Sequence, residues 1–306
     1  MEKDSKLEGI ANVNGVDIAY QLHGNSLHPT LLLIQGLSTP LTGWPGVMIE
    51  RFVAANFQVL LLDNRDVGCS EQLDHLSIPN MAWVITKYKL GLSIKTPYKL
   101  EDMMQDVIAL MDILNLPKVH VVGASMGGMI AQLMAIHHPI RVNTLTSIMS
   151  TTGYKTLPSV RADVSEILIK TPTSKSYEDQ MYYHIKKWKA IGSPDYPPSD
   201  AYLNEYVDSL LKRGITEKGT MRHVLALLAT DNREQALSKL DIPSLVIHGD
   251  GDRLINVAGG QATANAIPNA KLKIYPGMGH DFPIELIPKI VNDIVAHVNT
   301  NSGDRT

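Results

Sequence analysis

The chain has 306 residues, of which 44% are hydrophobic and 19% are charged, so it can bury a large core and is not globally disordered. Its formal net charge of −3 gives no basic surplus for binding nucleic acid or an anionic membrane surface. The single cysteine, Cys69, excludes an intramolecular disulfide framework, which fits a reducing compartment.

The sequence predicts neither a targeting signal nor a membrane span. The first six residues are mostly charged, and no apolar run follows them as it would in a signal peptide. No stretch approaches the ~20 apolar residues that a membrane-spanning helix needs. We therefore expect a cytoplasmic protein, with a frayed polar tail over residues 299–306.

The first part of the chain alternates between strand and helix patterns. Residues 9–13 and 16–20 alternate apolar and polar side chains around an Asn-Gly pair, which predicts a hairpin. Residues 30–34 form a continuous apolar run, typical of a strand buried on both faces. A second such strand is predicted at 59–62, and a helix is expected between the two, over residues 46–55.

The next segment is irregular before the alternation resumes. Residues 71–97 show no sustained period, so we expect a long excursion with one short helix near 80–90, and such excursions are often functional. From Leu100 apolar side chains fall at helical spacing, and Pro117 ends that helix. Three elements follow: a strand at 119–122, a helix to about 137 and a strand at 142–148.

Residues 151–240 differ from the rest, because they hold amphipathic helical patterns and no convincing strand. The helical patterns lie around residues 159–170, 177–190, 200–213 and 217–230. The later elements are a strand at 244–248, a helix near 257–266, a strand at 271–275 and a final helix to about 297. We therefore divide the chain into residues 1–150, a helical insertion at 151–240, and residues 241–306.

Strands that alternate with helices predict an α/β protein. We expect a mostly parallel sheet of about eight strands, with helices on both faces. In such sheets, functional sites form beyond the carboxyl ends of the strands. The polar and glycine-rich motifs of this chain each follow a predicted strand, so they can converge on one edge of the sheet.

The turn Gly123-Ala124-Ser125-Met126-Gly127 matches G-x-S-x-G between a strand and a helix. Such a turn holds its serine in strained backbone geometry and exposes the hydroxyl above the sheet. Glycines two residues before and after avoid a collision between Cβ atoms and the neighbouring elements. We predict that Ser125 is a catalytic nucleophile, although a helix N-cap serine in a glycine-rich start is the simpler alternative.

A serine nucleophile needs a base, and the base needs an acid to fix its tautomer. The predicted base is His280, in a glycine-rich loop after the last strand. The predicted acid is Asp252, just beyond another strand, with Asp250 as its close rival. A metal site formed by His248, Asp250 and Asp252 is disfavoured, because no second ligand cluster accompanies it.

The negative charge that develops on the substrate oxygen needs two backbone N–H donors. Met126, directly after the serine, is predicted to supply one of them. Leu37, after an early strand, is predicted to supply the other, with Gly36 allowing close approach of the backbone. A donor from the main chain explains why apolar side chains are acceptable at both positions.

Other interpretations of these motifs are weaker. The serine turn lacks the Gly-Lys-Ser/Thr ending of a phosphate-binding P-loop, and no G-x-G-x-x-G follows the first strands. The turn Asp63-Asn64-Arg65-Asp66 is expected to be structural, its charges binding one another and nearby backbone groups, with a direct role left open. The 13 methionines are expected to fill the core or to line an adaptable pocket rather than to bind a cofactor.

Several motifs together resemble the α/β-hydrolase superfamily, from about Gly9 to His297. They are Gln35-Gly36, the segment from Asp63 to Ser70, the turn from Gly123 to Gly128, Gly249-x-x-Asp252 and Gly279-His280. The order Ser125, Asp252, His280 is the order of that superfamily. The Asp-Asn-Arg-Asp turn, Pro97-Tyr98-x-Leu100-x-Asp102-Met103 and the serine turn also look like bacterial carboxylesterases related to the aclacinomycin methylesterase group.

This resemblance implies an α/β-hydrolase fold, in which residues 151–240 form the variable cap, and hydrolysis of small carboxylic esters without a cofactor or metal. Many relatives have His-Gly where this chain has Gln35-Gly36. The change leaves Leu37 as donor but puts the local hydrogen-bond support, and with it the substrate preference, in question.

Several alternatives to an esterase stay open. The same triad can serve C–C bond hydrolysis, acyl transfer, aminopeptidase action or perhydrolysis, and the fold can also serve a non-catalytic ligand-binding protein. Dehalogenases and epoxide hydrolases are disfavoured, because their nucleophile is an aspartate. The substrate is expected to be a small ester, and the sequence does not predict an oligomeric state.

Overall fold

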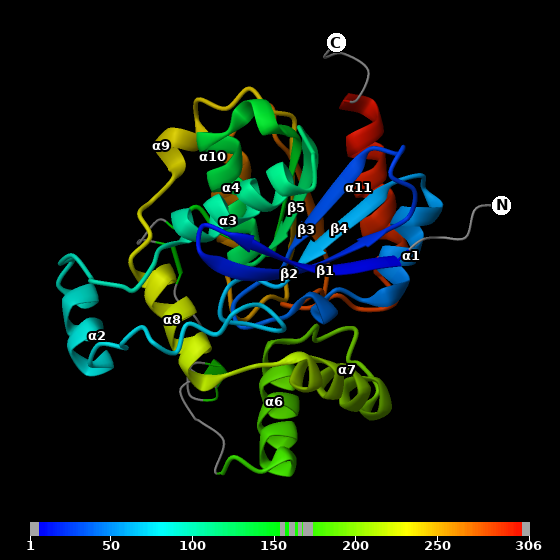
Figure 1. The fold of residues 1–306 in the computed structure, drawn as a ribbon. Helices are drawn as coiled ribbons and strands as arrows, with labels where there is room; N and C mark the ends of the chain where they lie inside the picture. Colours follow the sequence, from blue (N-terminus) through cyan, green and yellow to red (C-terminus); the bar gives the residue numbers. More distant parts are fainter. Residues whose placement is uncertain (1–5, 154–156, 159–162, 165–166, 168–173, 302–306) are drawn as a thin grey trace.

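The computed structural model describes residues 6–153, 157–158, 163–164, 167 and 174–301. The described residues form an α/β fold around one eight-stranded sheet (Figure 1). The strands are β1 (Lys6–Val13), β2 (Val16–His23), β3 (Thr30–Ile34), β4 (Gln58–Leu62), β5 (Val119–Ala124), β6 (Val142–Ile148), β7 (Ser244–Gly249) and β8 (Lys271–Tyr275).

The strand order is β1-β2-β4-β3-β5-β6-β7-β8. The six strands from β4 to β8 are parallel to one another, whereas the β1–β2 hairpin is antiparallel and joins the edge at β4. Asn14 and Gly15 turn the hairpin with φ angles of 52° and 79°, as a two-residue turn with left-handed backbone requires. The mostly parallel sheet that the alternating pattern predicted is therefore confirmed.

Helices cover both faces of the sheet. Seven of the described helices are α1 (Gly46–Ala54), α2 (Met81–Lys89), α3 (Leu100–Ile113), α4 (Met126–His137), α9 (Glu234–Leu237), α10 (Val257–Ala266) and α11 (Ile287–Asn301). In Figure 1, α1 and α11 lie on one side of the sheet, and α3, α4 and α10 lie on the other. Two short 3₁₀ helices, Leu41–Gly43 and Pro139–Arg141, complete these connections.

The central strands bury apolar side chains on both faces, which is why their sequences are continuous apolar runs. Leu32 and Leu60 pack into the cluster under α3 and α4. Leu31 and Leu61, one residue earlier or later, pack into the opposite cluster under α1 and α11. Because side chains alternate along a strand, two hydrophobic cores result, and together they fix the sheet that carries the site.

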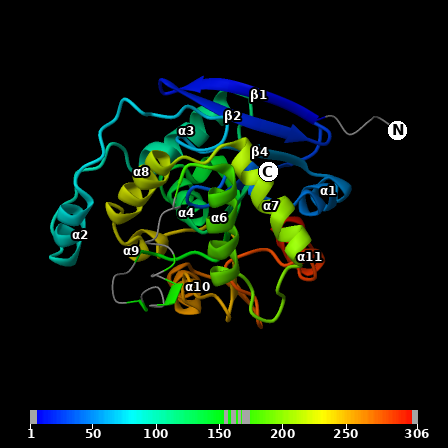
Figure 2. The same ribbon diagram turned by 90° about the horizontal axis from the view of Figure 1, so that it is seen from below.

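Besides the short helix α9, three longer described helices lie between β6 and β7, within the predicted insertion. They are α6 (Tyr177–Ile191), α7 (Asp200–Arg213) and α8 (Glu217–Leu228). Figure 1 shows α6 and α7 below the sheet, and Figure 2, viewed from that side, shows α6 in front of the core. The helix predicted at 159–170 lies largely outside the described residues.

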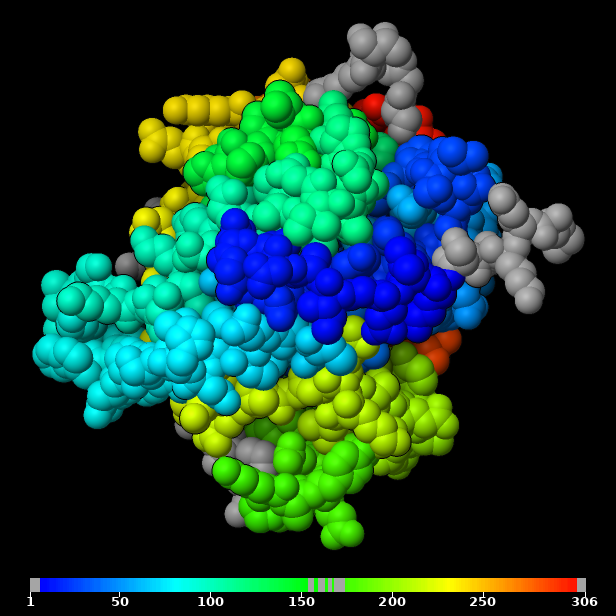
Figure 3. All heavy atoms as spheres, viewed as in Figure 1, coloured from blue at the N-terminus to red at the C-terminus, as the bar shows by residue number. Residues whose placement is uncertain are grey.

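The long excursion after β4 carries α2, as predicted. Figure 3 shows this segment, in cyan, projecting from the side of the molecule. Asn80 caps the helix, since its side chain accepts a hydrogen bond from Trp83 N. Trp83, Ile85 and Tyr88 are exposed on it, while Val84 anchors it. No described helix of the chain is both long and apolar enough to cross a bilayer.

Candidate active site

Ser125 stands at the sharp turn between β5 and α4. Its backbone has φ 55° and ψ −120°, a conformation that an L-residue adopts only when its surroundings impose it. The Ser125 N–H donates to Ile148 O at 2.9 Å, which fixes the turn against β6. The side chain makes no N-cap hydrogen bond to α4, so the simpler alternative of an ordinary capping serine is not what this turn uses.

The two glycines of the turn are required by close backbone packing. A Cβ atom at Gly123 would lie 2.1 Å from Gly127 O, and one at Gly127 would lie 2.1 Å from Ile34 O. Both distances are far below van der Waals contact with backbone atoms that cannot move aside. The motif therefore holds the Ser125 hydroxyl at the sheet edge because its neighbours carry no side chain.

His280 lies between Ser125 and Asp252. Its Nε2 is 2.9 Å from Ser125 Oγ, and its Nδ1 is 2.7 Å from Asp252 Oδ2. The carboxylate can only accept, so Nδ1–H donates to Asp252 and Nε2 accepts the Ser125 hydroxyl proton. The backbone N–H of His280 donates to Ile191 O at 2.8 Å, which joins the loop that carries His280 to the end of α6.

Asp252 is held as a buried anion. Its Oδ1 accepts hydrogen bonds from Leu254 N at 2.8 Å and Ile255 N at 2.9 Å. Burial by itself raises the pKa of Asp252, but the imidazoles of His280 and His248 outweigh it and hold the pKa well below its usual range. The carboxylate that faces His280 is thus ionised throughout the neutral pH range.

Asp250, the rival acid, has a different position. Its Oδ1 accepts a hydrogen bond from Gly277 N at 2.7 Å, so it joins the loop after β7 to the loop after β8. The structure therefore brings Asp252, and not Asp250, to His280.

His248 is a neighbour of Asp252 that lies outside the predicted triad of Ser125, Asp252 and His280. Its Nε2 lies 2.9 Å from Ile255 O and 3.3 Å from Asp252 Oδ2. Because the Ile255 carbonyl can only accept, Nε2 carries the proton. No group of three or more potential ligand side chains among the described residues has the arrangement of a metal site.

Leu37 and Met126, the two predicted backbone donors, are both near the serine turn. Met126 is the first residue of α4, so its N–H has no carbonyl partner inside the helix. Gly36 packs directly on the serine turn, and a Cβ atom there would lie 3.0 Å from Ser125 Cβ. Leu37 and Met126 line the same cavity as Ser125.

The Leu37 loop is supported by a helix of the insertion. Ser38, which has φ 54°, donates its N–H to His223 Nδ1 at 3.1 Å. His223 Nε2–H donates to Arg65 O at 2.7 Å, and Ser38 Oγ lies 2.5 Å from Thr220 Oγ1. Burial lowers the pKa of His223, so the ring is neutral and keeps Nδ1 as an acceptor. Gln35 adds local support, since its Oε1 accepts from Gly36 N at 3.0 Å.

The turn from Asp63 to Asp66 is held by partners far away in the sequence. Asp63 Oδ2 accepts from Arg213 of α7 at 2.7 Å, Arg65 forms a paired contact with Asp106 of α3, and Asp66 forms one with Arg222 of α8. These charges bind other elements rather than one another. None of the four side chains lines the cavity above Ser125.

A cavity of about 330 Å³ opens above Ser125 and His280. Its wall is mostly apolar, and it combines residues of the core with residues of α6, α7 and α8. A volume of this size suits a small molecule rather than a polymer. Core residues of the wall are Leu37, Met126, Met129, Met149, Leu254, Ile255 and Phe282, and residues of the insertion are Tyr183, Lys187, Trp188, Ile191, Tyr206, Val224 and Leu227.

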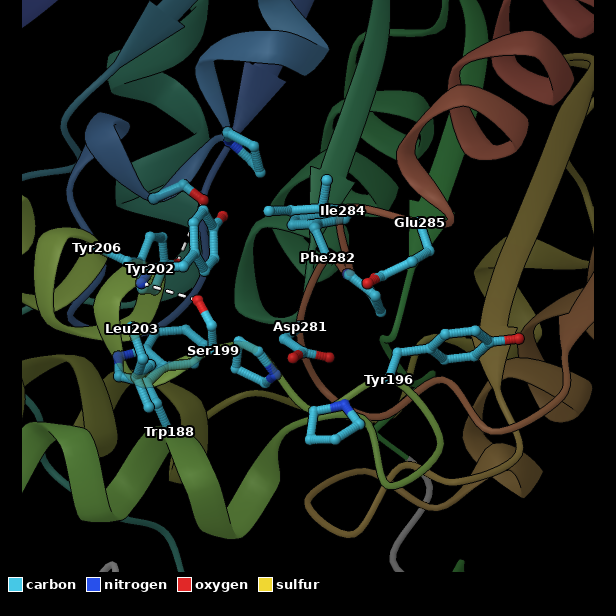
Figure 4. A pocket seen from close by; sticks show the side chains of 15 residues that line it. Trp188, Tyr196, Ser199, Tyr202, Leu203, Tyr206, Asp281, Phe282, Ile284 and Glu285 are labelled. Atoms are coloured by element: carbon cyan, nitrogen blue, oxygen red, sulfur yellow. Dashed lines mark hydrogen bonds between the residues drawn. The ribbon is translucent and has the colours of Figure 1, made fainter.

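A second cavity of about 200 Å³ adjoins the first (Figure 4). The two share five wall residues: Gly43, Trp188, Tyr206, Asp281 and Phe282. The Tyr206 hydroxyl donates to Gly43 O at 3.3 Å, which links α7 to the core at this boundary. The insertion thus forms one side of both cavities.

The fold and the site define the class of protein, and a family model supports it. The model described as alpha/beta hydrolase fold matches residues 29–182, just over half of the chain, so the chain belongs to this family. The fold is the one that the resemblance implied, and Ser125, Asp252 and His280 follow one another along the chain in the order expected for it.

Particular relatives are similar to this chain at low identity. Rhodomycin D methylesterase DnrP from Streptomyces peucetius is 25% identical over 90% of this chain and 92% of its own length. A 2-hydroxy-6-oxononadienedioate/2-hydroxy-6-oxononatrienedioate hydrolase from Dechloromonas aromatica is 24% identical over 86% of each. The crystal structure of the esterase RhEst1 from a Rhodococcus species superposes with a TM-score of 0.73 at 17% identity, over 97% of this chain and 100% of that chain.

Proposed function

We propose that this protein is a serine hydrolase that cleaves small carboxylic esters through an acyl-enzyme intermediate. The observation that carries the proposal is His280, which contacts Ser125 Oγ at 2.9 Å with one ring nitrogen and Asp252 at 2.7 Å with the other. The proposal also agrees with the name of one relative, a methylesterase, which is an enzyme that cleaves esters.

In this mechanism Ser125 attacks the ester carbonyl while His280 accepts its proton. Asp252 keeps the imidazole in the tautomer that accepts and stabilises the imidazolium that forms. His280 then protonates the leaving alcohol. A water molecule, activated by the same imidazole, attacks the acyl group and releases the acid and free Ser125.

The Leu37 and Met126 N–H groups are proposed to bind the oxyanion of each tetrahedral intermediate. Backbone donors that are fixed before the reaction do not have to reorganise when the charge develops. Loss of one such donor typically costs about 3 kcal/mol in transition-state stabilisation. The residues from 151 to 240 are proposed to act as a cap, because their helices supply the outer wall of the cavity.

Hydrolysis of a C–C bond in a diketone is the second candidate. The relative named as an oxononadienedioate hydrolase supports it. The same serine, histidine and aspartate can serve acyl transfer, amide cleavage or perhydrolysis, and the geometry around Ser125 is common to all of these.

A substrate panel on the purified protein separates these functions. We expect turnover of short p-nitrophenyl esters, followed by the absorbance of released p-nitrophenolate, and of simple alkyl esters, followed by acid release. We also expect covalent labelling by a fluorophosphonate. Turnover of diketones without turnover of esters would select C–C hydrolysis. A protein that neither labels nor turns over any of these substrates would be a binding protein on this fold.

Removing His223 should lower the rate without preventing substrate binding. His223→Leu deletes the acceptor for Ser38 N–H and frees the loop that presents Leu37. We expect kcat to fall about tenfold to a hundredfold, less than complete loss of an oxyanion donor, with KM little changed. His223→Asn, which keeps an acceptor near Nδ1, should recover part of the rate. If the folded leucine variant keeps the normal kcat, the loop does not depend on α8.

A further inference from the structure

One face of α6 points into the cavity and carries a lysine. Tyr183, Lys187, Trp188 and Ile191 line the cavity together, as residues at helical spacing should. The mechanism proposed above uses neither the charge nor the hydrogen bonds of Lys187.

Lys187 has no anionic partner among the described residues, whereas the nearby lysine of the same helix does. Lys189 forms an ion pair with Asp200 at 2.6 Å, but no ion pair or hydrogen bond involves Lys187 in the described part of the chain. Asp281 is the acidic side chain in the described wall, and it accepts a hydrogen bond from Ser193 Oγ at 2.5 Å instead. The ammonium group is therefore an unused donor beside a mostly apolar cavity.

The other titratable groups around the cavity do not neutralise this charge. Burial, and then the charge of Lys187 itself, lowers the pKa of His184 to about 4, so that ring is neutral. Burial raises the pKa of Tyr183 and Tyr206, which keeps both phenols neutral. His280 is committed to Ser125 and Asp252.

The environment makes a bound anion favourable. Burial lowers the pKa of Lys187 to about 8, because a cation without a partner is costly away from water, and the amine is still mostly protonated at pH 7. An anionic group of a ligand would replace the lost hydration and accept the free N–H bonds.

We propose that Lys187 forms a subsite for a carboxylate of the substrate, so that the preferred substrates are esters that carry a second, free carboxylate group. This inference rests on the proposed ester hydrolysis. The apolar wall holds the hydrocarbon that separates the carboxylate from the reacting carbonyl, and the ester carbonyl lies at Ser125. Monoesters of short dicarboxylic acids and acylated hydroxy acids are the two forms of this class.

The test compares matched charged and neutral esters. The substrates are monoethyl glutarate and 4-acetoxybutanoate, each with a free carboxylate, and ethyl pentanoate, which has none. In the unaltered enzyme we expect a higher kcat/KM for one of the charged esters than for the neutral one. The ratio of kcat/KM for that charged ester to kcat/KM for the neutral ester should fall about tenfold to a hundredfold in Lys187→Met, mainly because KM for the charged ester rises. Lys187→Arg should recover part of this ratio.

A neighbouring lysine provides the matched control. Lys186 is exposed on α6 and is not part of the cavity wall, so Lys186→Met should keep the ratio of the unaltered enzyme. The ratio should also decrease as the pH rises through about 8, because the neutral amine no longer attracts a carboxylate. Equal ratios in the unaltered enzyme and Lys187→Met would overturn the subsite and leave ester hydrolysis intact.

Binding separates the subsite from the chemistry. Calorimetric titration of Ser125→Ala with monoethyl glutarate should show binding that weakens about tenfold or more when Lys187→Met is added. Binding that depends on Lys187 in a protein without esterase activity would retain the subsite and remove the proposed function. Binding that is unaffected by Lys187→Met would remove the subsite.

Discussion

Replacing Ser125 with alanine is expected to abolish hydrolysis of a short p-nitrophenyl ester. The variant removes the oxygen that is proposed to form the acyl bond, while it leaves the cavity and the imidazole in place. In a serine hydrolase this change typically costs about a millionfold in kcat. The measurement is the initial rate of the purified variant against the unaltered enzyme at saturating ester.

Two controls make this result specific. Ser238→Ala changes an exposed serine whose hydroxyl donates to Gln235 O, away from the cavity, so the rate of this variant should be normal. Fluorophosphonate labelling should disappear in Ser125→Ala and persist in Ser238→Ala, with similar unfolding temperatures for all three proteins. Retained turnover in a folded Ser125→Ala protein would rule out the acyl-enzyme mechanism.

Asp252→Asn is expected to lower kcat about ten-thousandfold. The amide can donate a hydrogen bond to His280 Nδ1, which stabilises the tautomer whose Nε2 carries the proton and cannot accept one from Ser125. The amide also lacks the negative charge that stabilises the imidazolium. Leu254 N and Ile255 N can still donate to the remaining carbonyl oxygen, so the loop is expected to keep its shape.

The neighbouring aspartate supplies a matched control for this substitution. Asp250→Asn makes the same chemical change two residues away, but Asp250 binds Gly277 N and does not contact His280. Its kcat should stay close to normal, because an asparagine oxygen can still accept that hydrogen bond. If Asp250→Asn lost as much activity as Asp252→Asn, the two carboxylates would share the role and our assignment would be wrong.

Local pattern was enough to predict most elements of the fold. The strands Thr30–Ile34, Val142–Ile148 and Lys271–Tyr275 have the bounds that their apolar runs and flanking turn residues indicated. The four-residue helix α9 and the two short 3₁₀ helices were missed. Each is shorter than, or barely as long as, one helical turn, so none can show a hydrophobic period.

The site divides in the same way between local and distant information. Ser125, Asp252, His280, Leu37 and Met126 each lie in a short motif directly after a strand, so parallel-sheet geometry predicts their approach. Local sequence patterns could not identify His223, because its contact with Ser38 joins residues 185 positions apart and no motif indicates it. Lys187 lay within a predicted amphipathic helix, where a lysine is usually a solvated surface residue.

The contact between His223 and Ser38 limits how this chain can exchange parts with its relatives. Helix α8 lies in the segment between β6 and β7, yet it carries the acceptor for the loop that follows β3 in the sheet. An evolutionary or engineered graft that imported a foreign segment between β6 and β7 would bring new walls and a new substrate range. It would also remove the group that holds Ser38. A successful recombination therefore has to end the imported segment before α8, or import the other protein's loop after β3 together with its helices.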